Sequence, residues 1–95
     1  METILFDWDP NKNLLNVQKH GISFEDARDV FYDDEAILFD DPDHSDSEER
    51  FLILGRARDS NVLIVSHCYR SQDQIIRIIS ARKATKKEEA FYYFH

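Results

Sequence analysis

Residues 77–89, RIISARKATKKEE, form the stretch whose residue types are most suited to chemistry. Branched side chains typical of a strand lead into a basic cluster, and five of the thirteen residues are Lys or Arg. The chain as a whole is acidic, with a net charge of -7. A local reversal of charge of this kind favours a site for an anion such as a phosphate group.

Arg77 lies inside the strand-like part of this stretch. Strict alternation puts the odd-numbered residues, with Arg77, on one face and the even-numbered residues, with Arg82, on the other. Both faces are mainly apolar, which indicates a central strand. A guanidinium there either pairs with a carboxylate, for which Asp7 and Glu49 are available, or lines a cleft where its planar fork suits phosphate.

Arg50 and Arg56 flank the apolar sequence FLILG. They are six residues apart, so both point to the same face of a strand if no bulge intervenes. Gly55 indicates such a bulge or a close backbone approach. Arginines grouped on one sheet surface would form an anion site, whereas each alone is more often a solvated strand end.

Trp8 and the pair Lys19–His20 have two interpretations each. Trp8, the only tryptophan, either stacks against a base or belongs to the core. Lys19 and His20 end a predicted helix, where cations stabilise the helix dipole. Histidine also exchanges protons near neutral pH, so His20 is a candidate general acid or base.

Metal and thiol chemistry find little support in the sequence. His67 and Cys68 are adjacent on a strand and therefore face opposite ways. The acidic segment 40–49, DDPDHSDSEE, lacks the glycine and the closing glutamate of a calcium loop. No metal or cofactor is expected, and a nucleophilic role for Cys68 is poorly supported.

The expected elements must position these side chains. Asp9-Pro10 starts a helix over 11–20 and Gly21 ends it, while Ser23 caps a second helix. A last helix follows Thr85, with Glu88 completing a capping box and 90, 91 and 94 facing the core. Strands are expected at 5–8, 36–39, 50–57, 62–69 and 74–81, the first being the least secure. The predicted fold is α+β: an antiparallel sheet of about four strands, two N-terminal helices and one C-terminal helix.

Length and composition indicate one domain over residues 1–95. The chain is 42% hydrophobic with seven Phe, which is enough for a core and argues against disorder. Its apolar runs are too short to cross a bilayer and its start lacks a signal-peptide core, so a soluble cytoplasmic protein is expected. The first 49 residues hold three Lys or Arg against fifteen acids, and the rest hold nine against four.

Three motifs resemble the BrnT family of type II toxins, in the family's order and over residues 4–93. They are FDWDPNKNLLNVQKHGISFEDA, DPDHSDSEERFLILGRA and RIISARKATKKEEAFY. The resemblance implies a RelE-like ribonuclease toxin that cuts RNA without metal and arrests translation. It also implies a BrnA-type antitoxin with a ribbon-helix-helix domain, and contact with DNA only through the toxin–antitoxin complex.

The family's functional positions fall on Trp8, Arg56 and Arg77, with His20 and Lys19 as supporting catalytic candidates. The candidate RNA-binding residues are Lys12, Arg50, Arg82 and Lys83. In this hypothesis Arg56 and Arg77 hold the phosphate, His20 or Lys19 moves protons and Trp8 stacks on or walls the base. The alternative is a catalytically inactive module that binds the antitoxin and acts in operon autoregulation.

Overall fold

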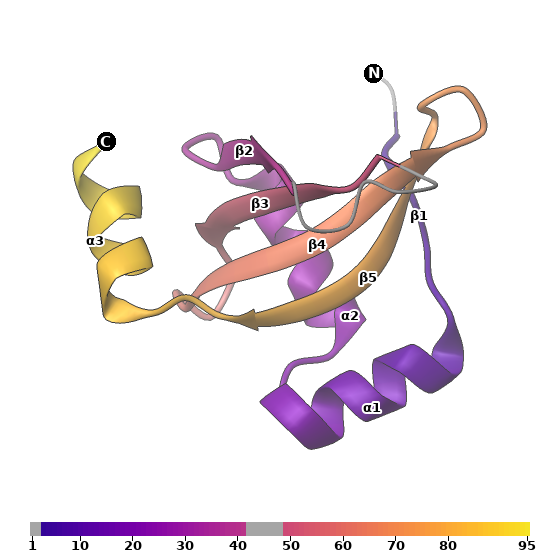
Figure 1. The fold of residues 1–95 in the computed structure, drawn as a ribbon, viewed down its shortest axis with the longest axis horizontal. Coiled ribbons are helices and arrows are strands. Elements are labelled where there is room, and N and C mark those ends of the chain that lie inside the picture. Colours follow the sequence, from indigo (N-terminus) through magenta and orange to yellow (C-terminus); the bar gives the residue numbers. More distant parts are fainter. Residues whose placement is uncertain (1–2, 42–48) are drawn as a thin grey trace.

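The computed structural model describes residues 3–41 and 49–95 (Figure 1). Five strands form one sheet in the order β1-β5-β4-β3-β2. The elements in chain order are β1 (Leu5–Asp7), α1 (Pro10–His20), α2 (Phe24–Ala27), the 3-10 helix η1 (Arg28–Tyr32), β2 (Ile37–Asp40), β3 (Phe51–Arg56), β4 (Val62–Arg70), β5 (Ile75–Lys83) and α3 (Lys86–Phe94). Most of the predicted acidic loop, residues 42–48, lies outside the described residues.

The sheet is mixed, which corrects the expectation of about four antiparallel strands. β2, β3, β4 and β5 pair antiparallel, but β1 runs parallel to β5, with Asp7 beside Arg77. The partner of β1 lies about seventy residues away in the sequence, so no local pattern could reveal the direction of pairing. The second predicted helix is also shorter than expected, because α2 gives way to η1 at Arg28.

Helix ends follow the predicted capping pattern. The Asp9 carboxylate accepts the N–H of Asn11, and Gly21 takes the left-handed conformation with φ 72°. Thr85 and Glu88 form the reciprocal capping box at the start of α3. Local chemistry therefore decides where these helices begin and end.

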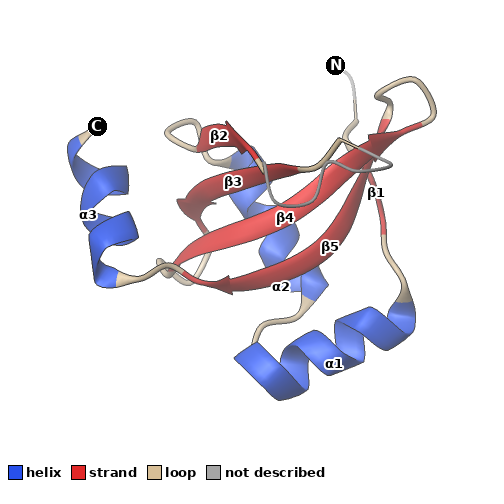
Figure 2. Ribbon diagram, in the orientation of Figure 1, coloured by secondary structure: helices blue, strands red, loops and turns tan. Residues whose placement is uncertain are grey.

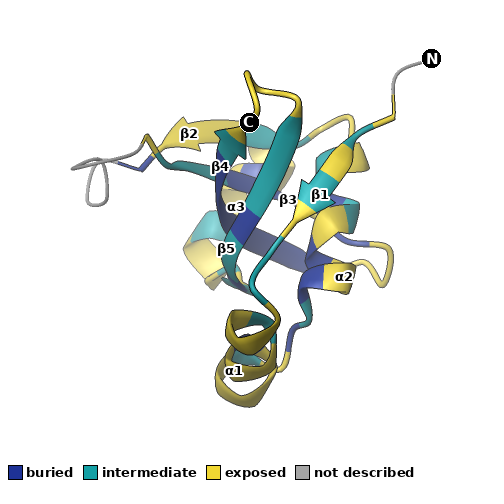
Figure 3. Cartoon of the chain, turned by 90° about the vertical axis from the view of Figure 1, so that its right-hand side faces the viewer, coloured by how far each residue is buried: buried dark blue, intermediate teal, exposed yellow. Residues whose placement is uncertain are grey.

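The main core lies between one face of the sheet and the segment α2–η1 (Figure 2). It contains Phe24 and Val30 from the helical side and Val65 and Ile78 from the sheet. β4 is the most deeply buried strand, whereas α1 is largely exposed (Figure 3). A smaller cluster on the opposite sheet face joins Leu54, Val62 and Ile64 to Tyr92 of α3.

The predicted core face of the last helix is wrong. Tyr92 is the buried residue of α3, whereas Phe91 and Phe94 are 51% and 87% exposed. Tyr92 packs against Leu54, Val62 and Ile64, so the helix buries one ring rather than a full stripe. No helix among the described residues is long and apolar enough to span a membrane.

The ladder between β4 and β5 contains an irregularity that changes which residues share a face. Ser66 pairs with Ser80, but the next residue, His67, pairs with Ile78, so Ile79 is an extra residue on β5. Arg77 and Arg82 consequently lie on the same face of the sheet, together with Ser80. This corrects the assignment from strict alternation, which placed the two arginines on opposite faces.

Candidate functional site

A cleft of about 230 Å³ opens on the sheet face opposite α2. Residues of the sheet form its floor, in two rows of cross-strand neighbours: Leu52, Ser66 and Ser80, then Ile64 and Arg82. The full lining, which we call the cleft below, is His20, Asp41, Arg50, Leu52, Ile64, Ser66 and residues 79–82. Three of the predicted functional residues, His20, Arg50 and Arg82, therefore meet on one concave surface.

Asn16 holds α1 where its last residue reaches the cleft. This buried amide donates to the carbonyl oxygens of Ile22 and Ala81 at 2.8 Å each, and it accepts the N–H of Ala81 at 3.1 Å. Its side chain thus satisfies the free edge of β5 in the manner of a strand backbone. His20, at the C-terminal end of the same helix, is thereby fixed at the rim of the cleft and is half-buried.

A second asparagine fixes the corner between the first two helices. The Asn13 side chain accepts the N–H of Phe24 at 2.8 Å and donates to Glu25 at 2.9 Å. That hydrogen bond is the main cause of a lowered pKa for Glu25. Asn13 and Asn16 are three residues apart and so face the same side of α1, which makes this helix a rigid support for His20.

Arg82 is held by α3. Its guanidinium forms a two-pronged hydrogen bond with Glu88, at 2.9 and 3.0 Å, and donates once to the carbonyl oxygen of Lys83. The hydrogen bond from Arg82 is the main reason why the pKa of Glu88 falls to about 2. Three of the five N–H donors of the guanidinium are thus in use, and two remain for a ligand.

Arg50 and Arg77 border the same sheet face. Arg50 lines the cleft, and no hydrogen bond of its side chain is found within residues 3–41 and 49–95. Arg77 lies farther along β5, opposite Cys68, and forms an ion pair with Asp7. The carboxylate partner considered for Arg77 is therefore present, and the pair is partly open to solvent, with 30% of the Arg77 side chain exposed.

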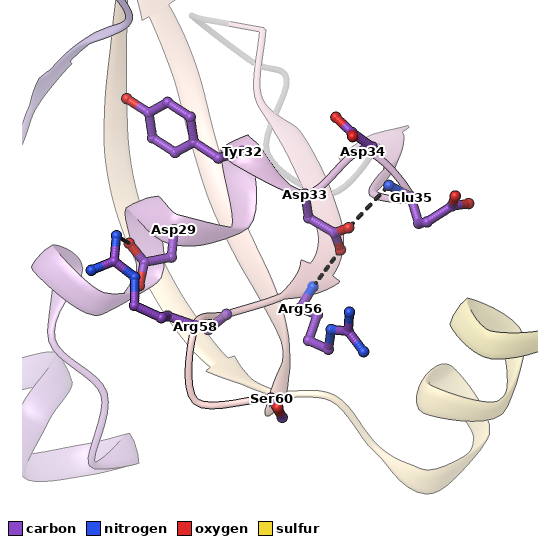
Figure 4. Close-up of a pocket in the computed structure, with 9 residues that line it drawn as sticks. Asp29, Tyr32, Asp33, Asp34, Glu35, Arg56, Arg58 and Ser60 are labelled. Atoms are coloured by element: carbon purple, nitrogen blue, oxygen red, sulfur yellow. Dashed lines mark hydrogen bonds and ion pairs between the residues drawn. The ribbon is translucent and has the colours of Figure 1, made fainter.

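Arg56 lies at the other end of the sheet, in an acidic depression (Figure 4). Its backbone N–H donates to Asp33 at 2.8 Å, and the Tyr92 hydroxyl donates to the same carboxylate oxygen at 2.5 Å. Partial burial alone would raise the pKa of Asp33. The hydrogen bonds to its carboxylate have a larger combined effect, so the pKa is lowered. Burial and the contact with Asp33 raise the pKa of Tyr92 to about 12.

Arg56 and Arg77 lie far apart along the sheet. Arg56 pairs with Val62 and Arg77 with Cys68, six residues apart on β4, which corresponds to about 20 Å. The two guanidinium groups therefore do not meet at one phosphate, as the sequence hypothesis required. Arg50 and Arg56 do share a face, but they too lie at opposite ends of β3.

The other predicted residues lie around this arrangement. Trp8 follows β1, packs against the main core and meets Phe24 edge-to-face at 6.1 Å. It therefore lies on the sheet face away from the cleft. Lys12 and Lys19 are exposed on α1, and Lys83 is exposed at the end of β5.

Sequence reasoning did not single out Asn16, Ser66 or Ser80. The signal for the serines was their polarity within otherwise apolar strands, and Asn16 was a polar residue in the middle of an amphipathic helix. No group of three or more His, Cys, Asp or Glu placed to hold a metal ion occurs in the described part of the chain.

Comparison with known proteins identifies the family. The profile of a family described as "Ribonuclease toxin, BrnT, of type II toxin-antitoxin system" matches residues 8–88. The chain belongs to the BrnT family. Membership makes it a ribonuclease toxin of a type II toxin–antitoxin system, and the match spans both the N-terminal helices and the basic strand β5.

A solved structure supports the fold. The 1.1 Å crystal structure of the Brucella abortus ribonuclease toxin, BrnT, superposes with a TM-score of 0.67. The two sequences are 24% identical, and the alignment covers 88% of this chain and 100% of the other. The comparison with curated proteins gives no match.

Proposed function

We propose that this BrnT-family chain cuts RNA in the cleft without a metal ion, and that this cleavage inhibits translation in the cytoplasm. A BrnA-type antitoxin with a ribbon-helix-helix domain neutralises it, and the toxin meets DNA only within that complex. The fold is of the RelE-like type. The observation that carries the proposal is the meeting of His20, Arg50 and Arg82 above two serine hydroxyls in one cleft.

The proposed reaction uses the RNA's own 2′-hydroxyl as nucleophile. Its oxygen forms a bond to the adjacent phosphorus while the bond to the 5′-oxygen breaks, which leaves a cyclic phosphate. His20, or Lys19 beside it, moves the protons: the neutral imidazole of His20 can accept the proton of the 2′-hydroxyl, and the charged form of either side chain can donate a proton to the leaving 5′-oxygen. Arg50 and the free donors of Arg82 stabilise the charge that builds on the phosphate oxygens.

The RNA strand follows the basic residues around the cleft. Arg77 lies next along the sheet face, and Lys83 lies beyond Arg82 at the end of β5. Lys12 and Lys19 on α1 supply charge at the other side. Trp8 supports the core beneath α1. Arg56 contacts the RNA only at the point where the RNA leaves the surface of the sheet.

Cleavage of a labelled single-stranded RNA in the presence of EDTA tests the proposal. We expect His20→Gln and Arg50→Ala to cut at least about 100-fold more slowly than the wild type, since each removes a group acting on the reacting phosphate. Arg58→Ala is the matched control, because that side chain is 89% exposed and lies in the acidic depression. Thermal unfolding of each variant separates lost chemistry from lost structure.

Two results would contradict the nuclease assignment to the cleft. One is full cleavage by both variants, which would place the reaction elsewhere. The other is complete loss of wild-type cleavage in EDTA with recovery on adding Mg²⁺, which would contradict the metal-free step. Growth and incorporation of labelled methionine, followed after induction without antitoxin, report translation arrest.

One observation favours the alternative of an inactive antitoxin-binding module. Arg77 and Arg82 both carry carboxylate partners, Asp7 and Glu88, which reduce their attraction for phosphate. In that case the wild type binds its antitoxin but neither cuts RNA nor arrests growth. The same cleavage and growth measurements therefore distinguish the two functions.

A further inference from the structure

An apolar groove of about 440 Å³ separates α3 from strands β2 and β3. Its lining, which we call the α3 groove, is Phe39, Asp40, Leu52, Leu54, Ile64, Lys87, Glu88 and Phe91. In Figure 1, α3 stands beside the end of the sheet, joined to it through the turn after β5. The helix is fixed by the buried ring of Tyr92 and by the ion pair between Glu88 and Arg82.

Large apolar side chains at the groove remain open to solvent. Phe91 is 51% exposed and Phe39 is 36% exposed, and their ring centroids are 6.0 Å apart. Two neighbouring aromatic rings on opposite walls of a concave surface match the anchor pockets of protein interfaces. Surfaces of this kind are uncommon unless they bind something.

The charge around the groove indicates the kind of partner. Asp40 lines it, and the exposed Asp34 and Glu35 precede the strand that forms one wall. Glu88 is neutralised by Arg82, and Lys87 contributes one positive charge. A second copy of this chain, with its net charge of -7, would bring like charges together, whereas a segment with basic residues would complement them.

The α3 groove is continuous with the proposed catalytic cleft. Leu52 and Ile64 line both of them. Glu88 lines the groove and at the same time holds Arg82, which lines the cleft. A segment lying in the groove would therefore end beside the residues that are proposed to bind RNA.

We propose that the α3 groove anchors a segment of the antitoxin that inserts large apolar side chains and carries Lys or Arg beside them. This rests on the proposed function, because it takes the protein antitoxin of the type II system as the partner. Docking there places the antitoxin next to Arg82 and obstructs access of RNA to the cleft.

Binding of the antitoxin encoded in the same operon tests the proposal. The purified antitoxin is titrated into the full-length toxin by calorimetry, and the dissociation constants of variants are compared. We expect Phe91→Asp and Phe39→Asp to weaken binding at least about tenfold, since each puts a charge into an apolar anchor site. Asp40→Lys should weaken binding as well, by removing the complementary charge.

Matched controls lie on surfaces outside the groove. Phe94→Asp changes an aromatic residue of the same helix that is 87% exposed, and Leu15→Asp changes a residue of α1 that is 61% exposed. Both should bind the antitoxin within about twofold of the wild type. Thermal unfolding confirms folding of each variant, and Phe91→Ala provides a milder change at the same site, with a smaller expected loss of affinity.

Three outcomes would overturn the proposal. The first is unchanged antitoxin binding by Phe91→Asp and Phe39→Asp, above all if Leu15→Asp abolishes binding. The second is wild-type dimerisation, seen by sedimentation, that Phe91→Asp abolishes, since the occupant would then be a second copy. The third is no binding of the antitoxin to the wild type. RNA cleavage by the toxin alone is measured separately, so a failed nuclease assignment is distinguishable from a failed docking site.

Discussion

At the residue scale, one buried amide joins the first helix to the sheet. Asn16 makes three hydrogen bonds and is 6% exposed, and two of those bonds satisfy the backbone of Ala81. Removing the amide leaves a buried N–H and two carbonyl oxygens without partners, which costs more than the bonds themselves contribute. The position of His20 depends on this attachment.

We therefore expect Asn16→Ala to lower the free energy of unfolding by about 2–4 kcal/mol. Urea unfolding followed by circular dichroism measures it. Gln18→Ala on the exposed side of α1 is the control and should stay within about 0.5 kcal/mol of the wild type. A similarly small effect at Asn16 would mean that solvent replaces its hydrogen bonds and that α1 is not held in this way.

His67 is a buried titratable group that the proposed chemistry does not use. It is 0% exposed and packs against Phe31, with ring centroids 4.8 Å apart. Its Nδ1 is 3.1 Å from the carbonyl oxygen of Val65, while Nε2 has no partner among the described residues. Burial lowers the pKa of this imidazole below its ordinary value of 6.5, so the fold favours the neutral form.

This shift makes stability depend on pH in a defined direction. Below pH 6.5 the unfolded chain binds a proton that the folded chain does not, so stability falls from pH 6.5 down to the lowered folded-state pKa. We expect the wild type to lose about 1 kcal/mol more than His67→Gln between pH 7.5 and 5.5. Urea unfolding at both pH values measures the difference, and parallel pH profiles would rule out the effect.

At the element scale, η1 packs directly against the backbone of β3. A Cβ atom on Gly55 would lie 2.7 Å from Cγ1 of Val30 and 3.0 Å from Cβ of Ala36. The glycine was predicted to mark a bulge or a close approach, and the structure shows a close approach. The absent side chain lets the helical segment approach the sheet and bury Val30.

Gly55→Ala should therefore destabilise the fold by about 1–3 kcal/mol through overpacking. Gly21→Ala offers a comparison with a different cause, because no atom lies within 4 Å there but φ is positive; we expect a cost of about 1 kcal/mol. Chemical unfolding of both variants gives the ranking. If Gly55→Ala were the milder change, η1 would have to move away from the sheet easily.

The elements themselves were largely predictable, since their signals are local. Asp9, Gly21 and Thr85 mark helix ends by hydrogen bonds within a few residues, and the hairpin strands follow from their apolar runs. The direction of β1 and the role of Asn16 were not predictable, because each depends on a partner more than sixty residues away. The sequence supplied His20, Arg50 and Arg82 as candidates but could not show that they line one cleft. It also could not show that Arg56 and Arg77 lie far apart.

At the scale of the whole molecule, a compact chain carries a large net negative charge. The radius of gyration is 12.8 Å, close to the value of about 12.4 Å for a compact chain of this length. The net charge is -7, and the sequence isoelectric point is about 4.9. Repulsion among the acids therefore opposes folding at neutral pH.

Salt should relieve this repulsion. We expect the melting temperature at pH 7.5 to rise by about 2–4 °C between low salt and 0.5 M NaCl, because the screening length falls below the separation of most surface charges. Near pH 4.9 the net charge vanishes, and the rise should vanish with it. Differential scanning calorimetry at both pH values measures the effect, and an equal rise at the two would point to general salting-out instead.

The extra residue at position 79 allows two arginines at an odd spacing to lie on one face of β5. Arg77 and Arg82 are five positions apart, and a regular strand would turn them to opposite faces. Because Ile79 has no partner on β4, the pairs on both sides of it keep their register. Deleting Ile79 would make Ile78 and Ser80 direct neighbours and would leave both arginines on the same face. A slip of one residue in the pairing on one side of Ile79 would instead turn that end of the strand over, so that Arg77 or Arg82 faced the core.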